Sequence, residues 1–399
     1  MVLALIGLFI VGISYLSFFM MQSITFEDHF AVPWAAGRLW LYEGVNPYDA
    51  GVLEFAQSAI NGSPFLAVLP ASAELVDPMI NLVFYLLLSM LPYTISRVIW
   101  VVILIVSAGF MGYISIHLTK WQLSLFEKFG VIILVLMWLP SVYTVFSGRL
   151  SLLVILIVIG CVHLLIKGQD TSAGLLLSLT FGSSPTSILI FILFLAWGIS
   201  RPRWEVIKAY FSGLAFLIVI FTLMLPAWPL SWVAVLLDNF QGWEWINTPL
   251  MILGGFFPGI QNFLLIFLHA GFLIYFMIQL VSILGKSGIV FMWKLSAILL
   301  IAYFLHVNGS IQHLFLILPA MFLVFRFWCE RWKVTGRLVS WSFMLFFFVA
   351  PWGFYHPGFN MTELSMPALF LVGFPLIVFS GLIWVRWWAL KIPKLYYET

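Results

Sequence analysis

The sequence predicts an all-α polytopic membrane protein. Of its 399 residues, 63% are hydrophobic and 8% are charged, and the mean hydropathy is +1.12. A soluble domain is typically about one quarter charged. Apolar runs of about 20 residues, which cross roughly 30 Å of hydrocarbon as a helix, recur along the whole chain. Since a membrane β-barrel would need alternating hydrophobicity instead, these runs favour a helical bundle.

Proline, glycine and charged residues divide the sequence into about 11–13 transmembrane or re-entrant helices. We expect one integral-membrane domain over 1–399: a first transmembrane helix at 1–20, an extracytoplasmic loop at 21–78, and the remaining bundle at 79–399. The first helix lacks a basic n-region and a small-residue cleavage site, which favours an uncleaved span. Spans are predicted near 2–20, 79–92, 97–118, 129–146, 150–167, 171–181, 185–200, 206–225, 260–284, 290–305, 311–327, 337–350 and 366–388.

The basic residues predict which ends of these helices face the cytoplasm. Under this list of spans, fifteen of the eighteen lysines and arginines fall on one side, as the positive-inside rule requires of the cytoplasmic face. They are Lys120, Lys128, Lys167, Arg201, Arg203, Lys208, Lys286, Lys294, the four bases of 326–337 and the three bases of 386–394. Ten of the fifteen acids fall on the other side, so the two charge patterns agree.

The apolar segment 79–92 conflicts with this topology if it crosses the membrane. A full crossing would place Lys120 and Lys128 outside. About 14 residues before Pro92 form roughly 21 Å of helix. We therefore expect a re-entrant hairpin that returns to the outer face.

The loop at 21–78 is the longest water-compatible stretch of the chain. Seven of the fifteen acids lie in it: Glu27, Asp28, Glu43, Asp49, Glu54, Glu74 and Asp77. Tryptophans at 34 and 40 within 30–44 predict a helix that lies along the membrane interface, with Gly44 as its C-cap. Asp49 is expected to cap a second short helix at 50–60. A plain amphipathic lid has the same composition.

Two runs in this loop, Asp28 to Arg38 (DHFAVPWAAGR) and Gly44 to Asp49 (GVNPYD), resemble the first-loop signature of glycosyltransferase family 87. Members of this family are GT-C type membrane enzymes that use polyprenyl-phosphate sugars. Similar elements follow in order up to about residue 220. They are Asp77-Pro78, Pro140 with Gly148-Arg149-Leu150-Ser151, and Lys167-Gly168-Gln169-Asp170 with Ala173-Gly174-Leu175 and Pro185.

The chain departs from the family pattern at two polar positions. Ser184 stands where the family has the lysine of a Lys-Pro turn, and Arg149 stands where it has a glutamine. One cation is lost and another gained on the same predicted face. This exchange fits either a relocated phosphate-binding charge or a divergent, inactive member.

The resemblance implies that the first-loop acid is the general base, which makes Asp28 our candidate catalytic residue. One residue of slack in the spacing would place His29 there instead. Asp28 could equally be a solvated loop acid or a cap. Asp77 is a second candidate for the site, and capping the helix after Pro78 is its alternative role.

Three arginines remain on the outer face against the positive-inside bias. Arg149 is the first candidate to bind the donor phosphate, because its planar fork matches phosphate oxygens, and Arg38 and Arg97 are lesser candidates. Interfacial anchoring is the alternative for each. His306 and His313 flank a predicted external break and could contact sugar or phosphate oxygens.

The sequence therefore predicts an enzyme that transfers a hexose, mannose by resemblance, from a polyprenyl-phosphate donor to a lipid or glycan acceptor. We expect a multi-pass protein of a bacterial plasma membrane with an extracytoplasmic site, membrane lipids as neighbours and no nucleic-acid partner. No cofactor besides the lipid-linked donor is expected, and no metal-ligand spacing is present, although a divalent metal stays open. The alternatives are a transporter or flippase for lipid-linked substrates, or an inactive GT-C-like scaffold.

Overall fold

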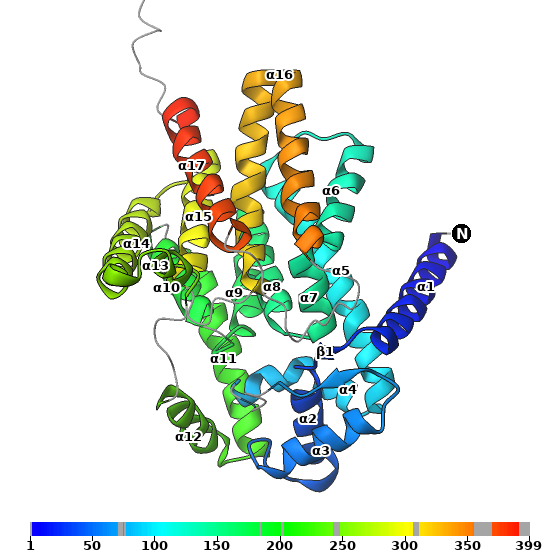
Figure 1. The fold of residues 1–399 in the computed structure, drawn as a ribbon. Coiled ribbons are helices and arrows are strands. Elements are labelled where there is room, and N and C mark those ends of the chain that lie inside the picture. Colours follow the sequence, from blue (N-terminus) through cyan, green and yellow to red (C-terminus); the bar gives the residue numbers. More distant parts are fainter. Residues whose placement is uncertain are drawn as a thin grey trace, which may run out of the picture.

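A computed structural model describes residues 2–70, 75, 77–183, 185–200, 203–241, 248–305, 311–354 and 369–390. Within these residues most of the chain is helical and the strands are two pieces of two residues each, which confirms the all-α class (Figure 1). Five helical segments are long and apolar enough to cross a membrane: Tyr93–Thr119, Trp204–Met224, Pro258–Ile283, Ile311–Gly353 and Leu369–Trp388. Shorter apolar helices occur at Ser151–Ile166, Ile190–Ser200, Trp228–Asp238 and Gly288–Phe304.

The first loop folds around two helices, α2 (Ala31–Glu43) and α3 (Gly51–Asn61), after α1 (Val2–Ser23). Strand β1 (Phe26–Glu27) pairs in parallel with β2 (Ala67–Val68), which closes the loop on itself. Gly44 caps α2 in the left-handed conformation at φ 68°, as predicted. Asp49 accepts a hydrogen bond from the backbone N–H of Gly51 (2.8 Å) at the start of α3.

The surroundings of α2 differ from the predicted interfacial position. Its tryptophans, Trp34 and Trp40, are 3% and 7% exposed, and most of the helix is covered by protein. Trp34 packs on Phe55 of α3 and on Tyr93 of α5 (Tyr93–Thr119). Since an apolar aromatic helix satisfies both a lipid interface and a protein core, its composition does not distinguish the two.

Segment 79–92 does not form the expected re-entrant hairpin. Met79–Phe84 is a 3-10 helix (η1), and Leu86–Ser89 is a single helical turn (α4) that packs against α2. Pro78 and Pro92, both extended, bracket this segment, and α5 begins directly after Pro92. The segment therefore stays with the first loop, and α5 crosses from that loop to Lys120, as the charge bias requires.

The predicted span at 129–146 is two helices, α6 (Leu125–Met137) and α7 (Leu139–Ser147), that are bent by 56°. Trp138 at the break has extended backbone angles. Pro140 has no N–H to donate to the carbonyl four residues earlier and its ring would clash there, so a single helix cannot run through this point. The Trp138 side chain is fully buried against Phe315, Phe347 and Phe348.

The remaining helices complete the bundle in Figure 1. They are α8 (Ser151–Ile166), α9 (Asp170–Ser178), α10 (Pro185–Ser200), α11 (Trp204–Met224), α12 (Trp228–Gln241), α13 (Met251–Gly255), η2 (Pro258–Ile260), α14 (Gln261–Ile283), α15 (Gly288–Phe304), η3 (Ile311–Ile317), α16 (Leu318–Val349), η4 (Ala350–Phe354), η6 (Leu369–Gly373), α17 (Phe374–Val385) and η7 (Arg386–Leu390).

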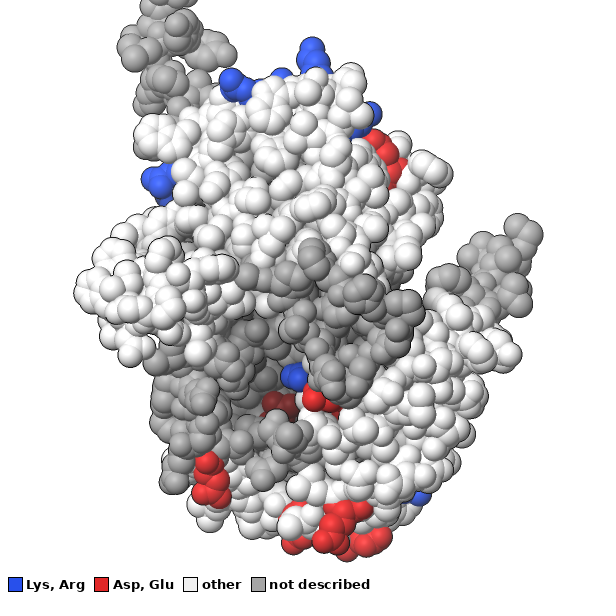
Figure 2. Space-filling view, viewed as in Figure 1, with Lys and Arg blue, Asp and Glu red and all other residues white. Residues whose placement is uncertain are grey.

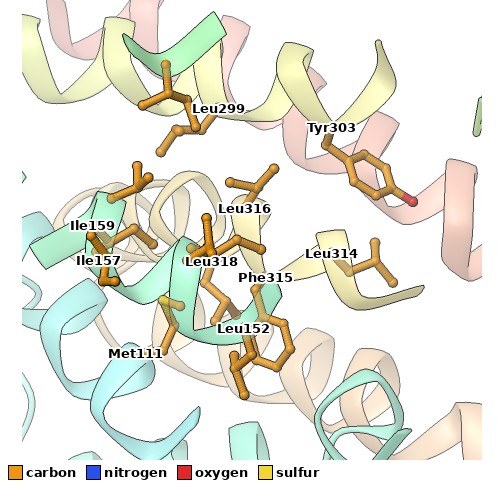
Figure 3. Packing of buried hydrophobic residues seen from close by; sticks show 14 of the residues in the cluster. Met111, Leu152, Ile157, Ile159, Leu299, Tyr303, Leu314, Phe315, Leu316 and Leu318 are labelled. Atoms are coloured by element: carbon orange, nitrogen blue, oxygen red, sulfur yellow. The ribbon is translucent and has the colours of Figure 1, made fainter. Parts of the chain in front are cut away.

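The core lies where η3 enters the bundle between α7, α8 and α15. Figure 3 shows Phe315 and Leu316 of η3 among Leu152 of α8, Met111 of α5 and Leu299 of α15. All five side chains are essentially fully buried. This packing fixes η3 and the start of α8 relative to each other, and both contribute to the cavity described below.

Charge is divided between the two ends of the molecule. Figure 2 shows basic side chains gathered at the end that α16 reaches and acidic side chains at the end formed by α2 and α3. A hollow between the two ends contains both acidic and basic side chains.

Candidate active site

A cavity of about 290 Å³ lies between the first loop, the segment before η1, and the starts of α8 and η3. Its volume is near the lower limit of small-molecule sites, which suits a compact polar group. The polar residues of its wall are Asp28, His29, Asp77, Tyr85, Arg149, Ser151, Ser183 and Gln312. Asp28, Asp77 and Arg149, three residues predicted from the sequence, therefore meet in one cavity.

Asp28 is fully buried in the wall of this cavity and is held by three donors. Arg97 Nε lies 3.0 Å from Oδ2, and the Tyr93 hydroxyl donates to the same oxygen. The backbone N–H of Phe30 donates to Oδ1 (2.8 Å) at the start of α2. A carboxylate offers about four acceptor positions. One position on Oδ1 is therefore left for a further donor.

Arg97 is the electrostatic partner of Asp28 and not an open phosphate site. Its side chain is fully buried, and its guanidinium lies over the rings of Phe26 and Phe30, 5.2 and 5.8 Å from their centroids. It also donates to the carbonyl of Phe146, next to the end of α7. The pair therefore ties the first loop to α5 and α7.

Gly148, which ends α7, is part of this arrangement because of its backbone angle and its closeness to the ion pair. Its φ is 72°, and an added Cβ would lie 3.0 Å from both Arg97 Nη1 and Phe30 Cβ.

We expect Gly148→Ala to lower the unfolding temperature and to reduce the free energy of unfolding by about 1–3 kcal/mol, since strain and crowding act together. Thermal unfolding of the purified protein measures this. Gly168→Ala, also at positive φ (76°) but with open space around it, is the matched control. Equal losses would show that crowding of Arg97 contributes nothing.

Asp77 is the second carboxylate of the cavity, and its environment differs from that of Asp28. Its side chain is partly open to the cavity, and no ion pair to it is found among the described residues. Burial by the surrounding loop raises the pKa of Asp77 to about 7, and the Asn81 amide opposes part of this rise. Asp77 therefore exchanges its proton near neutral pH.

Arg149 is the cation of the cavity, and it is only loosely paired. Its Nη2 lies 4.0 Å from Glu27 Oε2, while His29 Nε2 lies 3.4 Å from the same oxygen. The contact with His29, together with the charge of Arg149, holds the pKa of Glu27 below its ordinary value. Burial lowers the pKa of His29, so its ring is neutral at pH 7. Arg149 thus keeps most of its hydrogen-bonding capacity.

Several polar atoms on the cavity wall have no hydrogen-bond partner in the described part of the chain. They include Arg149 Nε, Ser151 Oγ and Gln312 Oε1. A buried polar atom without a partner costs free energy. Such atoms on one cavity wall mark the positions where a bound polar ligand would supply the missing partners.

The other predicted residues lie elsewhere. Arg38 donates to the carbonyls of Ser89 (3.1 Å) and Leu91 (3.3 Å), so it joins α2 to α4 and does not line the cavity. His313 is buried in η3, next to Gln312, and does not line the cavity either. His306 and Ser184 are outside the described residues. No group of three or more histidine, cysteine or acidic side chains that could hold a metal ion occurs among the described residues.

Sequence reasoning missed Ser151 and Gln312 as members of the site. Ser151 ends the Gly148-Arg149-Leu150-Ser151 element, and Gln312 directly precedes His313. In the first element the sequence prediction named Arg149, which also lines the cavity, and passed over Ser151. In the second it named His313, whereas the neighbouring Gln312 lines the cavity, because helical phase decides which neighbour faces it.

The sequence model of glycosyltransferase family 87 matches residues 76–305, which is more than half of the chain. The matched range contains Asp77, Arg97, Arg149 and Ser151 and begins after the first-loop residues around Asp28. No curated protein and no solved structure matches the chain.

Proposed function

The chain belongs to glycosyltransferase family 87, and we propose that it transfers a hexose, mannose in the first instance, from a polyprenyl-phosphate donor to a hydroxyl of a lipid or glycan acceptor. Family membership supports glycosyltransferase activity in a multi-pass membrane protein. The observation that carries the proposal is the cavity that brings together Asp28, Asp77 and Arg149.

We assign the general base to Asp28. As the acceptor oxygen bonds to the anomeric carbon, its proton passes to the free position on Asp28 Oδ1, and the bond from that carbon to the phosphate oxygen breaks. Arg97 and Tyr93 occupy Oδ2 and so fix the orientation of the carboxylate. Asp28 is therefore an oriented base, and the lipid phosphate leaves with the bond electrons.

We assign the acceptor-binding role to Asp77. It lies on the same cavity wall as Asp28, and its ionised form can accept a hydrogen bond from a sugar hydroxyl. Ionisation of Asp77 near pH 7 would then control how the acceptor is held.

We assign to Arg149 the role of binding the donor phosphate. Its Nε has no hydrogen-bond partner among the residues that the structure describes, and its planar fork suits phosphate oxygens. Ser183 lines the same cavity, and the residue that follows it, Ser184, stands where the family has a lysine by resemblance. This closeness supports the hypothesis that the cation at Arg149 replaces the one missing at Ser184.

The charge division between the two ends supports an extracytoplasmic site. The cavity is lined by residues of the first loop, which forms the acidic end, while Figure 2 shows basic side chains gathered at the opposite end, which the positive-inside rule assigns to the cytoplasm. We propose a bacterial plasma membrane as its location.

The test is a transfer assay with purified protein, a labelled polyprenyl-phosphate mannose and candidate lipid or glycan acceptors, run from pH 5 to pH 9. We expect transfer that increases as the pH rises through about 7, because Asp77 acts when ionised. Asp77→Asn should lose this pH dependence and retain part of the activity. A profile unchanged in Asp77→Asn would contradict its role. Absence of transfer with every donor would favour the inactive scaffold, and movement of an intact lipid-linked sugar across vesicles would favour the flippase.

A further inference from the structure

A second cavity, of about 680 Å³, lies at the opposite end of the helices that form the active site. Helices α5 and α8 begin at the candidate active site, with Tyr93 and Ser151, and both reach this second cavity where they end. The 27 residues of α5 span about 40 Å, so the two cavities are separated by most of a membrane. We call this second space the basic cavity.

Positive charge gathers in the basic cavity. Lys120, Lys128, Lys167 and Arg326 line it, and no aspartate or glutamate is among its described lining residues. Arg326 pairs with Glu330 (2.7 Å), but the three lysines form no ion pair within the part of the chain that the structure describes. An anion placed here would meet uncompensated positive charge.

The indole of Trp121 adds a hydrogen-bond donor to the same wall. Its side chain is 4% exposed and packs between Phe322 and Phe325, with both ring centroids 5.7 Å away. Its Nε1 is buried and has no hydrogen-bond partner among the described residues. An acceptor oxygen in the cavity would satisfy this donor.

The backbone conformation of Lys120 is a third indication that the basic cavity binds an anion. Lys120 ends α5 in the left-handed conformation at φ 54°, where glycine is the usual residue. A lysine at this position costs free energy that glycine would avoid, and such strain tends to persist where a side chain is used. Lys120 is one of the residues that line the cavity.

The rest of the wall is apolar and reaches the outer surface of the bundle. It includes Ile116, Leu123, Phe291 and Met292, and two of its residues, Tyr113 and Ile166, are 48% and 51% exposed. In a membrane protein, exposed apolar side chains on long apolar helices face lipid chains. The occupant should therefore combine an anionic group with hydrocarbon.

We propose that the basic cavity binds the phosphate head group of an anionic phospholipid from the leaflet at the basic end. Lys120, Lys128 and Lys167 neutralise the phosphate, Trp121 donates to it, and the apolar wall accepts the first part of the acyl chains. Basic pockets between membrane helices on the cytoplasmic side bind such head groups in other proteins. This site is separate from the proposed transfer reaction and does not depend on it.

The test measures lipid binding by the full chain purified in detergent and stripped of lipid, using thermal stabilisation and native mass spectrometry. Phosphatidylglycerol is compared with phosphatidylcholine and with inorganic phosphate. We expect phosphatidylglycerol to stabilise the protein and the other two not to. The triple variant Lys120→Gln, Lys128→Gln, Lys167→Gln should weaken phosphatidylglycerol binding at least tenfold. Lys208→Gln, at a lysine that pairs with Glu205 and does not line the cavity, is the matched control.

A second variant, Lys120→Gly, separates binding from folding. It removes both the strain and one cation, so lipid-free protein should unfold at a higher temperature while its stabilisation by phosphatidylglycerol decreases. Equal stabilisation by phosphatidylcholine or by inorganic phosphate would overturn the proposal, as would unchanged binding in the triple variant.

Discussion

Asp28→Asn is expected to reduce sugar transfer by about 10³-fold or more, because removal of a positioned general base typically costs 10²- to 10⁴-fold. The substitution keeps an oxygen that can accept from the N–H of Phe30 but removes the charge opposite Arg97. Breaking a buried ion pair by removing one partner costs about 3–5 kcal/mol. Unfolding must therefore be measured alongside the rate of transfer.

Two further variants separate loss of the base from loss of the fold. Tyr93→Phe removes a hydrogen bond to the same carboxylate and leaves the carboxylate itself, so transfer should fall by less than tenfold. The double variant Asp28→Asn, Arg97→Gln removes both buried charges. It should regain stability relative to Asp28→Asn alone without regaining transfer. Near-normal transfer by a folded Asp28→Asn protein would exclude Asp28 as the base.

Asp28 was a candidate from the sequence alone, and it lies in the wall of the cavity. Local sequence patterns can therefore identify which segment contributes to the site. The loop signature and the charge bias identified its segment, and the structure places it in the cavity. Its partner was not predictable in the same way. Arg97 is 69 residues further along the chain, and the pairing depends on how the start of α5 packs against the loop. From the sequence, Arg97 looked like a free cation.

For the helices too, some features were predictable from the sequence and others were not. Apolar length predicted where most of them lie, and the break between α6 and α7 follows from Pro140, a signal that was already present in the sequence. The position of α2 was not available from its composition, since aromatic residues suit both a membrane interface and a protein core. Segment 79–92 was mistaken for a hairpin because hydropathy alone does not show that a short apolar segment packs on protein.

Arg149→Gln, which restores the residue typical of the family, is expected to raise the KM for the polyprenyl-phosphate donor by about 10- to 100-fold. A hydrogen bond to a charged group contributes about 1.5–3 kcal/mol, and each 1.4 kcal/mol changes affinity tenfold. The maximal rate should fall less, because the base is untouched. Steady-state kinetics with the labelled donor measures both quantities.

The hypothesis that Arg149 replaces a lysine at position 184 also predicts that activity can be restored by a second substitution. If Arg149 replaces the lysine that the family carries at position 184, then adding Ser184→Lys to Arg149→Gln should bring the donor KM back towards the wild-type value, since Ser183 of that turn lines the same cavity. Arg38→Gln is the matched control. Arg38 donates hydrogen bonds to the carbonyls of Ser89 and Leu91 and does not line the cavity, so the donor KM should stay unchanged. A KM that Ser184→Lys fails to lower would show that the two cations act at different points of the site, and an equal rise in Arg38→Gln would assign the effect to the loop and not to the phosphate.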